Sequence, residues 1–223
     1  LDHYLPALLD DGLYHADGQI LDEVYVHGSF VQSKMHRAGV ACSNCHEPHS
    51  AQLKIPGNGV CTQCHNVNGR ADFPSLRPAN YDSIEHHFHQ QGTEAAACVS
   101  CHMPERVYMG IDGRRDHSFR KPRPDLSERT RAPNPCTDCH KSESVQWAAD
   151  AVRAHFGAPP ADETVHFGVI FALARDGQLN AESALAAVAQ NSKQPDIVRA
   201  TALSLMGRYQ RQISSEAIVA GLN

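Results

Sequence analysis

The chain has 223 residues, a formal net charge of −5, 41% hydrophobic residues and only 6% aromatic residues. This length suffices for one large domain or two small ones, but the apolar content is thin for a core built from side chains alone. No run approaches the roughly 18 apolar residues that a membrane span needs. With a net negative charge as well, we expect neither a membrane span nor a nucleic-acid partner.

Residues 1–35 contain scattered leucine, isoleucine and valine side chains and precede the first cysteine. We expect them to form a small packing segment against a bound group or against chain upstream of Leu1. The sequence begins with leucine and shows no basic start followed by an apolar stretch. We therefore expect that a targeting peptide has been removed or that the sequence is a segment of a longer chain.

From residue 42 onward the chain carries four copies of a Cys-x-x-Cys-His motif, which together use all eight cysteines. Two thiols at this spacing can each add to one vinyl group of the same porphyrin, and the adjacent histidine then supplies a ligand to the iron. The motifs predict four covalently bound c-type haems. The attachment residues are Cys42, Cys45, Cys61, Cys64, Cys98, Cys101, Cys136 and Cys139, and the motif histidines are His46, His65, His102 and His140.

A single such pair would also suit half a zinc site, a redox dithiol or a disulfide. A zinc site does not require the following histidine, and a disulfide scaffold does not need uniform spacing. Histidine fills about 5% of the other positions, so its chance occurrence after all four pairs has a probability on the order of 10⁻⁵. Haem attachment is the favoured interpretation. Because such attachment takes place outside the bacterial cytoplasmic membrane, we expect a periplasmic or extracellular location.

Eleven histidines remain outside the motifs, against four methionines in the whole chain. This surplus favours histidine on both faces of each iron and therefore low reduction potentials, which a sulfur ligand would raise. The candidates for the second ligand are His36, His49, His86, His89 and His117. If residues 86–89 are helical, His86 and His89 share a face and His87 does not. The alternative for each candidate is an ordinary surface histidine, and His155 and His166 are not expected to be ligands.

A basic run surrounds His117 between the third and fourth motifs and would suit the carboxylates of haem propionates. It consists of Arg114, Arg115, Arg120, Lys121 and Arg123. The alternative is a solvated loop. Four ferric haems would bring the net charge to roughly −9, so a redox partner with a basic face is expected. Within residues 1–142 no convincing strand pattern occurs, and we expect short helices at the motifs with the haems as the core.

Residues 143–223 differ in character, because cysteine is absent, alanine is frequent and apolar residues recur at helical spacing. Helices are expected near 143–156, 163–176, 181–190, 195–208 and 214–222. Paired helices of this kind stack into solenoids. The predicted fold is mainly α with extensive loops: a haem-cored multihaem cytochrome domain in residues 1–142, followed by an α-helical, HEAT-like repeat segment in residues 143–223. We expect this segment to be truncated or covered by the haem domain.

Several segments resemble the multihaem c-type cytochromes of the doubled-CxxCH kind in which a haem domain precedes HEAT or tetratricopeptide repeats. The resemblance is carried by residues 39–49, 98–104, 115–120, 122–125 and 135–140, and residues 195–203 are similar to a HEAT helix. It covers most of the chain. It implies histidine ligation on both faces of the haems and electron transfer through closely packed haems.

The sequence thus predicts extracytoplasmic electron transfer, with redox proteins as donor and acceptor or with further copies of the chain in a haem-stacked oligomer. An alternative from another class is an enzyme, in which one haem with an open face would reduce a nitrogen or sulfur oxyanion. The surplus of histidines favours the carrier. A third interpretation treats the helical tail as a docking scaffold, with the haems as a relay.

Overall fold

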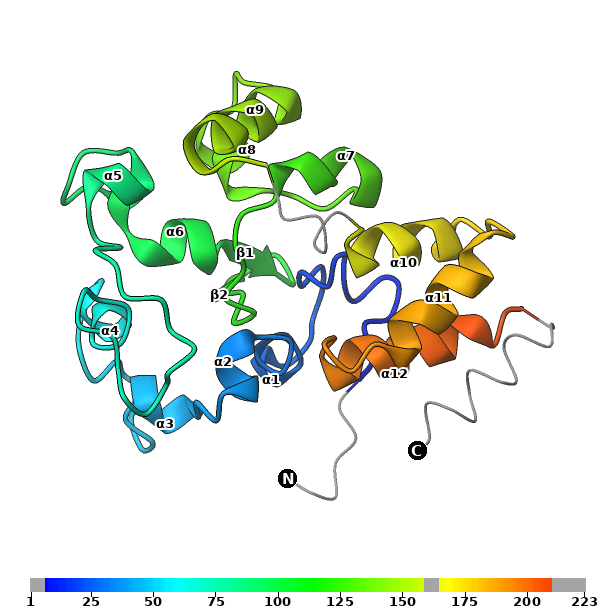
Figure 1. The fold of residues 1–223 in the computed structure, drawn as a ribbon, viewed down its shortest axis with the longest axis horizontal. Helices are drawn as coiled ribbons and strands as arrows, with labels where there is room; N and C mark the ends of the chain where they lie inside the picture. The colour runs from blue at the N-terminus through cyan, green and yellow to red at the C-terminus, as the bar shows by residue number, and fades with distance from the viewer. Residues whose placement is uncertain (1–6, 159–164, 210–223) are drawn as a thin grey trace.

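The computed structural model describes residues 7–158 and 165–209, which form a mainly helical structure with long loops and one small sheet. The α-helices are α1 (Val26–Phe30), α2 (Lys34–Arg37), α3 (Cys42–Cys45), α4 (Gly59–Thr62), α5 (Ile84–His87), α6 (Cys98–His102), α7 (Ser127–Thr130), α8 (Pro135–Cys139), α9 (Val145–Phe156), α10 (Phe167–Arg175), α11 (Ala181–Gln190) and α12 (Asp196–Met206). The remaining elements are the strands β1 (Glu105–Tyr108) and β2 (Asp112–Arg115) and the 3₁₀ turns η1 (Glu94–Ala96) and η2 (Pro124–Leu126). Helices α3, α4, α6 and α8 follow an arc away from α10–α12 (Figure 1).

Each attachment motif begins on a short helix: α3, α6 and α8 contain both cysteines of their motifs, whereas α4 ends at Thr62, after the first cysteine of the second motif. In three of the motifs the backbone N–H of the histidine donates to the carbonyl of the first cysteine at 2.9 Å. These bonds join His46 to Cys42, His65 to Cys61, and His140 to Cys136. One helical turn therefore separates the first cysteine from the histidine and puts both on the same side of the helix. The prediction of short helices at the motifs is confirmed.

The expectation that residues 1–142 contain no strands is wrong, because β1 and β2 pair as an antiparallel hairpin with Tyr108 opposite Asp112. Their sequences are charged and do not alternate between apolar and polar residues, so the usual strand signal is missing. The hairpin depends instead on its turn. Met109 and Gly110 both adopt positive φ, at 52° and 75°, and Met109 is not a residue from which such a turn is expected.

The C-terminal helices lie close to their predicted ranges. Helix α9 begins at Val145 because the Ser144 side chain accepts the N–H of Trp147 at 3.0 Å. Helix α10 begins only at Phe167, after His166 at its N-cap, and α11 matches its predicted range. The helix expected near 214–222 lies outside the described residues. The chain is thus mainly helical, while the assignment of this part to HEAT-like repeats stays a prediction.

The hydrophobic core joins both ends of the described chain. Leu9, Tyr14 and Ile20 are at most 2% exposed and belong to one buried cluster with the apolar faces of α10, α11 and α12. The other members of the cluster include Tyr108, Phe167, Phe171, Leu185, Val198 and Met206. The N-terminal segment, expected to cover a bound group or upstream chain, therefore packs on the C-terminal helices. Contacts cross the predicted domain boundary between residues 142 and 143, and that division stays a prediction.

Polar contacts fix the same junction. The backbone N–H of Leu9 donates to the hydroxyl of buried Thr201 at 3.0 Å, and that hydroxyl donates to the carbonyl of Ile197 at 2.7 Å. Arg175 donates to the carbonyls of Tyr14 and Leu9 at 2.9 and 2.7 Å. The N-terminal segment has no regular partner strand or helix for these groups, so side chains of α10 and α12 satisfy them.

His166 titrates outside its usual range because of its place at the start of α10. Its Nδ1 accepts the N–H of Gly168 at 3.1 Å, and the Asp17 backbone lies so close that a Cβ on Gly168 would be 2.6 Å from the Asp17 Cα. Burial, followed by the charge of Arg120, lowers the pKa of His166 to about 4; Arg123 acts in the same direction, and Asp17 and Asp125 oppose the shift. The folded state therefore holds His166 neutral.

We expect this histidine to make the fold acid-sensitive. Below about pH 6.5 the His166 imidazole binds a proton in the unfolded chain, whereas in the folded chain it does so only below about pH 4. The free energy of unfolding therefore falls as the pH falls through this window. His166→Asn keeps an N-cap acceptor but does not titrate. Chemical unfolding at pH 7 and pH 4.5 should show a loss larger in the parent than in the variant by on the order of 2 kcal/mol. Equal losses in the two proteins would contradict the assignment.

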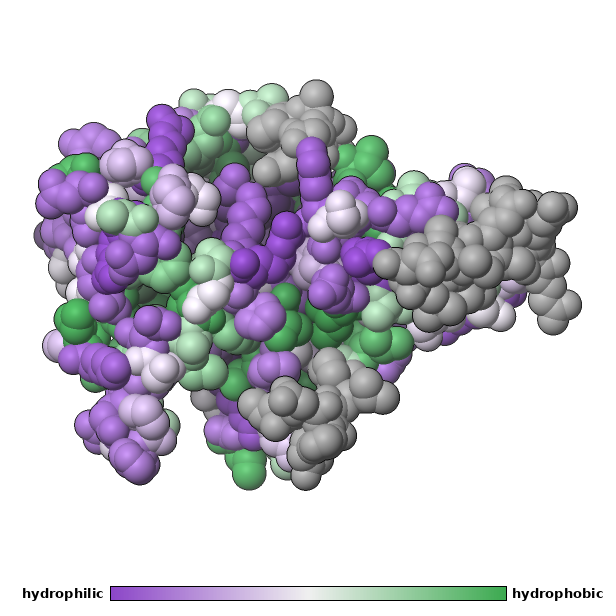
Figure 2. All heavy atoms as spheres, turned by 60° about the horizontal axis from the view of Figure 1, so that its bottom comes forward, coloured by the Kyte–Doolittle hydropathy of each residue, from purple (hydrophilic) through white to green (hydrophobic). Residues whose placement is uncertain are grey.

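The region that carries the motifs has little apolar core of its own. Few large apolar side chains between residues 42 and 142 are buried, about half of them are exposed, and among the described residues of this range Tyr108 is the one that joins the buried cluster. The exposed side chains are Leu53, Ile55, Val67, Ile84, Phe88, Val107, Met109 and Ile111. Figure 2 shows hydrophobic patches between hydrophilic ones on the face that it draws. Such a region suits large apolar prosthetic groups that take the place of a side-chain core.

Candidate haem sites

Three of the four motif histidines face a second histidine across nearly the same distance. The ring centroids of His46 and His117 lie 6.3 Å apart, and those of His102 and His86 lie 6.2 Å apart. The third pair, His140 and His89, is separated by 6.1 Å. Two iron–nitrogen bonds of about 2 Å, with each ring centre about 1 Å beyond its nitrogen, would put the centroids about 6 Å apart. The three pairs therefore fit an iron ligated by histidine on both faces.

Hydrogen bonds orient these rings for metal binding. The Nδ1–H groups of His46 and His102 donate to the carbonyls of Ala51 and Arg120, each at 2.7 Å. On the opposite side, His117 donates from Nδ1 to the carbonyl of Arg115 at 2.8 Å. The Nδ1 of His89 makes the corresponding bond to the carbonyl of His87. A carbonyl on Nδ1 fixes the tautomer and leaves Nε2 with its lone pair available to the iron.

One short segment supplies the facing rings for two motifs. Helix α5 ends at His87 because Phe88 adopts a left-handed conformation with φ of 56°. Residues 86–89 are therefore not one helix, and the condition under which His86 and His89 would share a face is not met: the turn at Phe88 directs His86 to His102 and His89 to His140. His87 is engaged elsewhere, because its Nε2 lies 3.0 Å from the Gln91 amide oxygen and its Nδ1 accepts from the His89 N–H.

The remaining motif histidine, His65, has a different neighbour. Its ring lies 5.9 Å from Tyr81 in an edge-on arrangement, and the Tyr81 hydroxyl donates to the Arg77 carbonyl at 2.9 Å. Within residues 7–158 and 165–209, no ring contact joins a second histidine to His65. His36 instead lies edge-on to Phe30 at 5.3 Å, and His49 donates its backbone N–H to Glu47. Ligation by His36 and His49 stays a prediction.

Consecutive motifs lie next to one another. Asn58 at the start of α4 accepts the N–H of Cys98 at 2.9 Å and donates to the Ala96 carbonyl at 3.1 Å, which ties α4 to α6. The thiols of Cys61 and Cys98 hydrogen-bond, which raises the pKa of Cys61 and lowers that of Cys98. The sequence gives no signal for this role of Asn58, since its partners lie about forty positions away.

The thiols of the other neighbouring motifs lie close enough to influence one another's pKa. Burial, and then the charge of Cys64, raises the pKa of Cys45. Burial followed by the charge of Cys136 raises the pKa of Cys101 to about 11. The four attachment sites thus follow one another in space in the order in which they occur along the chain. No disulfide joins any of the eight cysteines, all of which lie within the described residues.

Most of the basic run around His117 is paired with protein groups. Arg114 bonds Glu23 and Asp112 at 2.6 and 2.7 Å, and Arg123 holds Asp125 at 2.8 Å. Arg115 lies 3.4 Å from Glu105, and Arg120 bonds two acceptors that are described below. A role of this run in holding propionates stays a prediction.

Helix α9 contacts two of the paired histidines, which the helical pattern did not indicate. The ring of His155 stacks on Phe88 at 3.7 Å, and Phe156 lies 5.9 Å from His86. Near the other end of the helix, Trp147 lies 4.9 Å from His140. His155 and Phe156 thus pack against α5 and Phe88, and Trp147 packs against the histidine of the fourth motif.

Comparisons with known proteins concern the motifs and the fold. Residues 35–71 match the family model described as the doubled CXXCH motif. A solved structure, described as the crystal structure of the outer cell wall cytochrome OcwA, aligns with a TM-score of 0.45 and 14% sequence identity. That alignment covers 95% of this chain and 52% of the other, so the chain spans about half the length of that cytochrome. No curated protein sequence matches the chain. The motif match and the four CxxCH sequences support a multihaem c-type cytochrome that binds haem covalently.

Proposed function

We propose that this chain transfers electrons through four covalently attached c-type haems, at least three of them ligated by histidine on both faces. The observation that carries the proposal is the set of three histidine pairs, 6.1 to 6.3 Å apart, each of which contains one motif histidine. Four of these six rings donate Nδ1–H to a backbone carbonyl and so present Nε2. The proposed pairs are His46 with His117, His102 with His86, and His140 with His89.

A bound haem supplies one-electron redox chemistry through its iron. The chain's own residues decide the potential and the order of the sites. Two imidazoles per iron, at least one of which in each pair is made more basic by a carbonyl on Nδ1, favour the oxidised state and hence a low potential. Asn58 holds the second and third motifs together, and the other neighbouring motifs lie close to one another. A path from the first motif to the fourth follows from this arrangement.

The number of haems is tested by the mass of the purified protein. Four haems should add roughly 2.5 kDa to the 24.4 kDa polypeptide. Replacing Cys98 and Cys101 by alanine should lower the added mass by about 0.6 kDa, because one haem loses both thioether bonds. A colourless protein with eight titratable thiols would contradict the proposal.

The reductase alternative concerns His65. It requires one haem with a free second face, and His65 is the motif histidine for which the described residues provide no second histidine in ring contact. Electron paramagnetic resonance of the oxidised protein distinguishes the two functions. Wholly low-spin signals, with loss of one of them in His36→Ala or His49→Ala, favour the carrier. A high-spin signal in the oxidised parent protein favours the reductase.

The proposal extends to the setting of the protein. Covalent haem attachment supports a location outside the cytoplasm. Within the described residues, no helix is both long enough and apolar enough to cross a bilayer. The negative charge supports partners with a basic face, or further copies of the chain in a haem-stacked oligomer, and does not favour nucleic acid. Helices α10–α12 are proposed as the beginning of a HEAT-like array on which a partner would dock.

A further inference from the structure

The four residues 117–120 connect the ligands of two different motifs. His117 faces His46, the histidine of the first motif. Three residues later, the carbonyl of Arg120 accepts the Nδ1–H of His102, the histidine of the third motif, at 2.7 Å. The backbone N–H of Arg120 donates to the carbonyl of the same His102 at 3.2 Å. A displacement of this segment would therefore move His117, the proposed second ligand at the first motif. It would also move the Arg120 carbonyl, which orients His102 at the third motif.

The backbone of the segment is held in a conformation that its sequence does not favour. Phe119 has φ of 49°, in the left-handed region that β-carbon-bearing residues rarely adopt. Such a residue persists only where its surroundings determine its conformation. The Phe119 ring lies edge-on to Phe30 at 6.3 Å and to His117 at 5.9 Å. On the other side of the turn, the N–H of His117 donates to the Ser29 hydroxyl at 3.1 Å.

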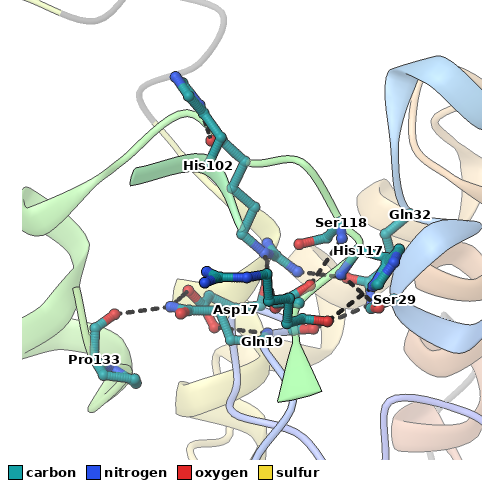
Figure 3. Close-up of polar contacts among 12 residues, drawn as sticks. Asp17, Gln19, Ser29, Gln32, His102, His117, Ser118 and Pro133 are labelled. Carbon is teal, nitrogen blue, oxygen red and sulfur yellow. Dashed lines mark hydrogen bonds and ion pairs between the residues drawn. The ribbon is translucent and has the colours of Figure 1, made fainter. Parts of the chain in front are cut away.

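The Arg120 side chain supplies the anchor on the His102 side. It is 20% exposed, and its two terminal nitrogens donate to the Asp17 carbonyl and to the Gln32 amide oxygen, each at 2.7 Å. Figure 3 shows Asp17, Gln32, Ser29 and His117 gathered in this network, with His102 above it. Gly18 makes room for it: a Cβ there would lie 2.2 Å from the Gln32 oxygen and 3.0 Å from Arg120 Nη2.

We infer that Arg120 is a positioning residue for the haem ligands His102 and His117, so that the junction of residues 17–32 with residues 117–120 sets the potentials of the haems at the first and third motifs. The inference rests on the proposed function. The guanidinium group of Arg120 donates to two acceptors in fixed directions. These bonds hold the Arg120 backbone carbonyl in line with His102 Nδ1. That bond makes the imidazole more basic, which stabilises oxidised iron.

The direction in which the reduction potential changes distinguishes the positioning effect of Arg120 from the effect of its charge. Loosening the Arg120 carbonyl weakens the bond from His102 and shifts the potential upward. Loss of a positive charge alone would shift it downward, because a nearby cation favours the reduced state. Arg120→Lys keeps the charge but cannot form the fork. Gly18→Ala keeps Arg120 and displaces its partner, so it tests the same contact from the opposite side.

The experiment is a spectroelectrochemical titration of the haem-loaded protein, with electron paramagnetic resonance of the oxidised form. In Arg120→Lys and in Gly18→Ala, we expect the reduction potential of the haem at the third motif to shift upward and the low-spin signal of the haem at the first motif to change. The reduction potential of the haem at the fourth motif should stay the same. The added haem mass should equal that of the parent. If Arg120→Lys does not accumulate, Gly18→Ala decides.

Arg175→Lys is the matched control, because Arg175 also anchors the N-terminal segment through two backbone carbonyls but contacts none of the proposed ligands. It should lower stability and leave the potentials unchanged. Unchanged potentials in both test variants, or the same shift in Arg175→Lys, would overturn the inference while leaving the proposed function intact. A missing haem in the parent protein would instead remove the proposed function itself.

Discussion

Replacing His89 by alanine should convert about a quarter of the low-spin haem signal to a high-spin signal, because one iron of the proposed four loses its second imidazole. The structure pairs His89 with His140 at 6.1 Å and ties its Nδ1 to a carbonyl. The converted haem should also titrate at a higher potential than in the parent. Magnetic circular dichroism and electron paramagnetic resonance of the oxidised protein measure the fraction converted.

His87→Ala provides the control for this experiment. His87 lies two positions away on the same segment, but its ring nitrogens contact Gln91 and the backbone of His89. Its removal should leave every haem low-spin. If His87→Ala produced the conversion and His89→Ala did not, the proposed pairing with His140 would be wrong.

Replacing Phe171 by alanine should lower the free energy of unfolding by about 3 to 5 kcal/mol, the usual cost of truncating a fully buried phenylalanine. Phe171 is 0% exposed, and its ring packs edge-on against Phe167 at 5.3 Å within the cluster that includes Leu9 and Tyr14. Because this cluster joins the N-terminal segment to α10–α12, helical structure and haem ligation should be lost together. Denaturant unfolding followed by circular dichroism and by haem absorption tests this coincidence.

Leu173→Ala, on the same helix, is the matched variant. Leu173 is 38% exposed, so its truncation should cost less than about 1 kcal/mol. Separate transitions for the two probes in Phe171→Ala would show that the haem region unfolds independently of the core. In that case the predicted division between residues 142 and 143 would describe two cooperative units.

The motif spacing was sufficient to predict the local structure of the attachment sites. Cysteine and histidine four positions apart need one helical turn, and each motif occupies such a turn. The tail helices were also predictable, since an apolar stripe at helical spacing reflects burial on one side. Their ends moved by a few residues because capping side chains, such as Ser144, decide where a helix begins.

The facing histidines could not be paired from the sequence. His117 and His46 meet only through the loops between them. On the segment of His86, His87 and His89, a single left-handed residue, Phe88, decides which rings face the motif histidines. Phe88 carries no sequence signal for that conformation, since glycine or asparagine would be expected there. The hairpin could not be predicted for the same reason: Met109 adopts a positive φ in its turn without a sequence signal for it.

The bond between Leu9 and Thr201 has a consequence for the order of biogenesis. Its partners are 192 positions apart, so the apolar cluster cannot close until nearly all of the described sequence has been synthesised. An attachment motif is a five-residue unit that is complete as soon as it emerges. We therefore expect the thiols to remain open to the attachment machinery during export, and final compaction to come last.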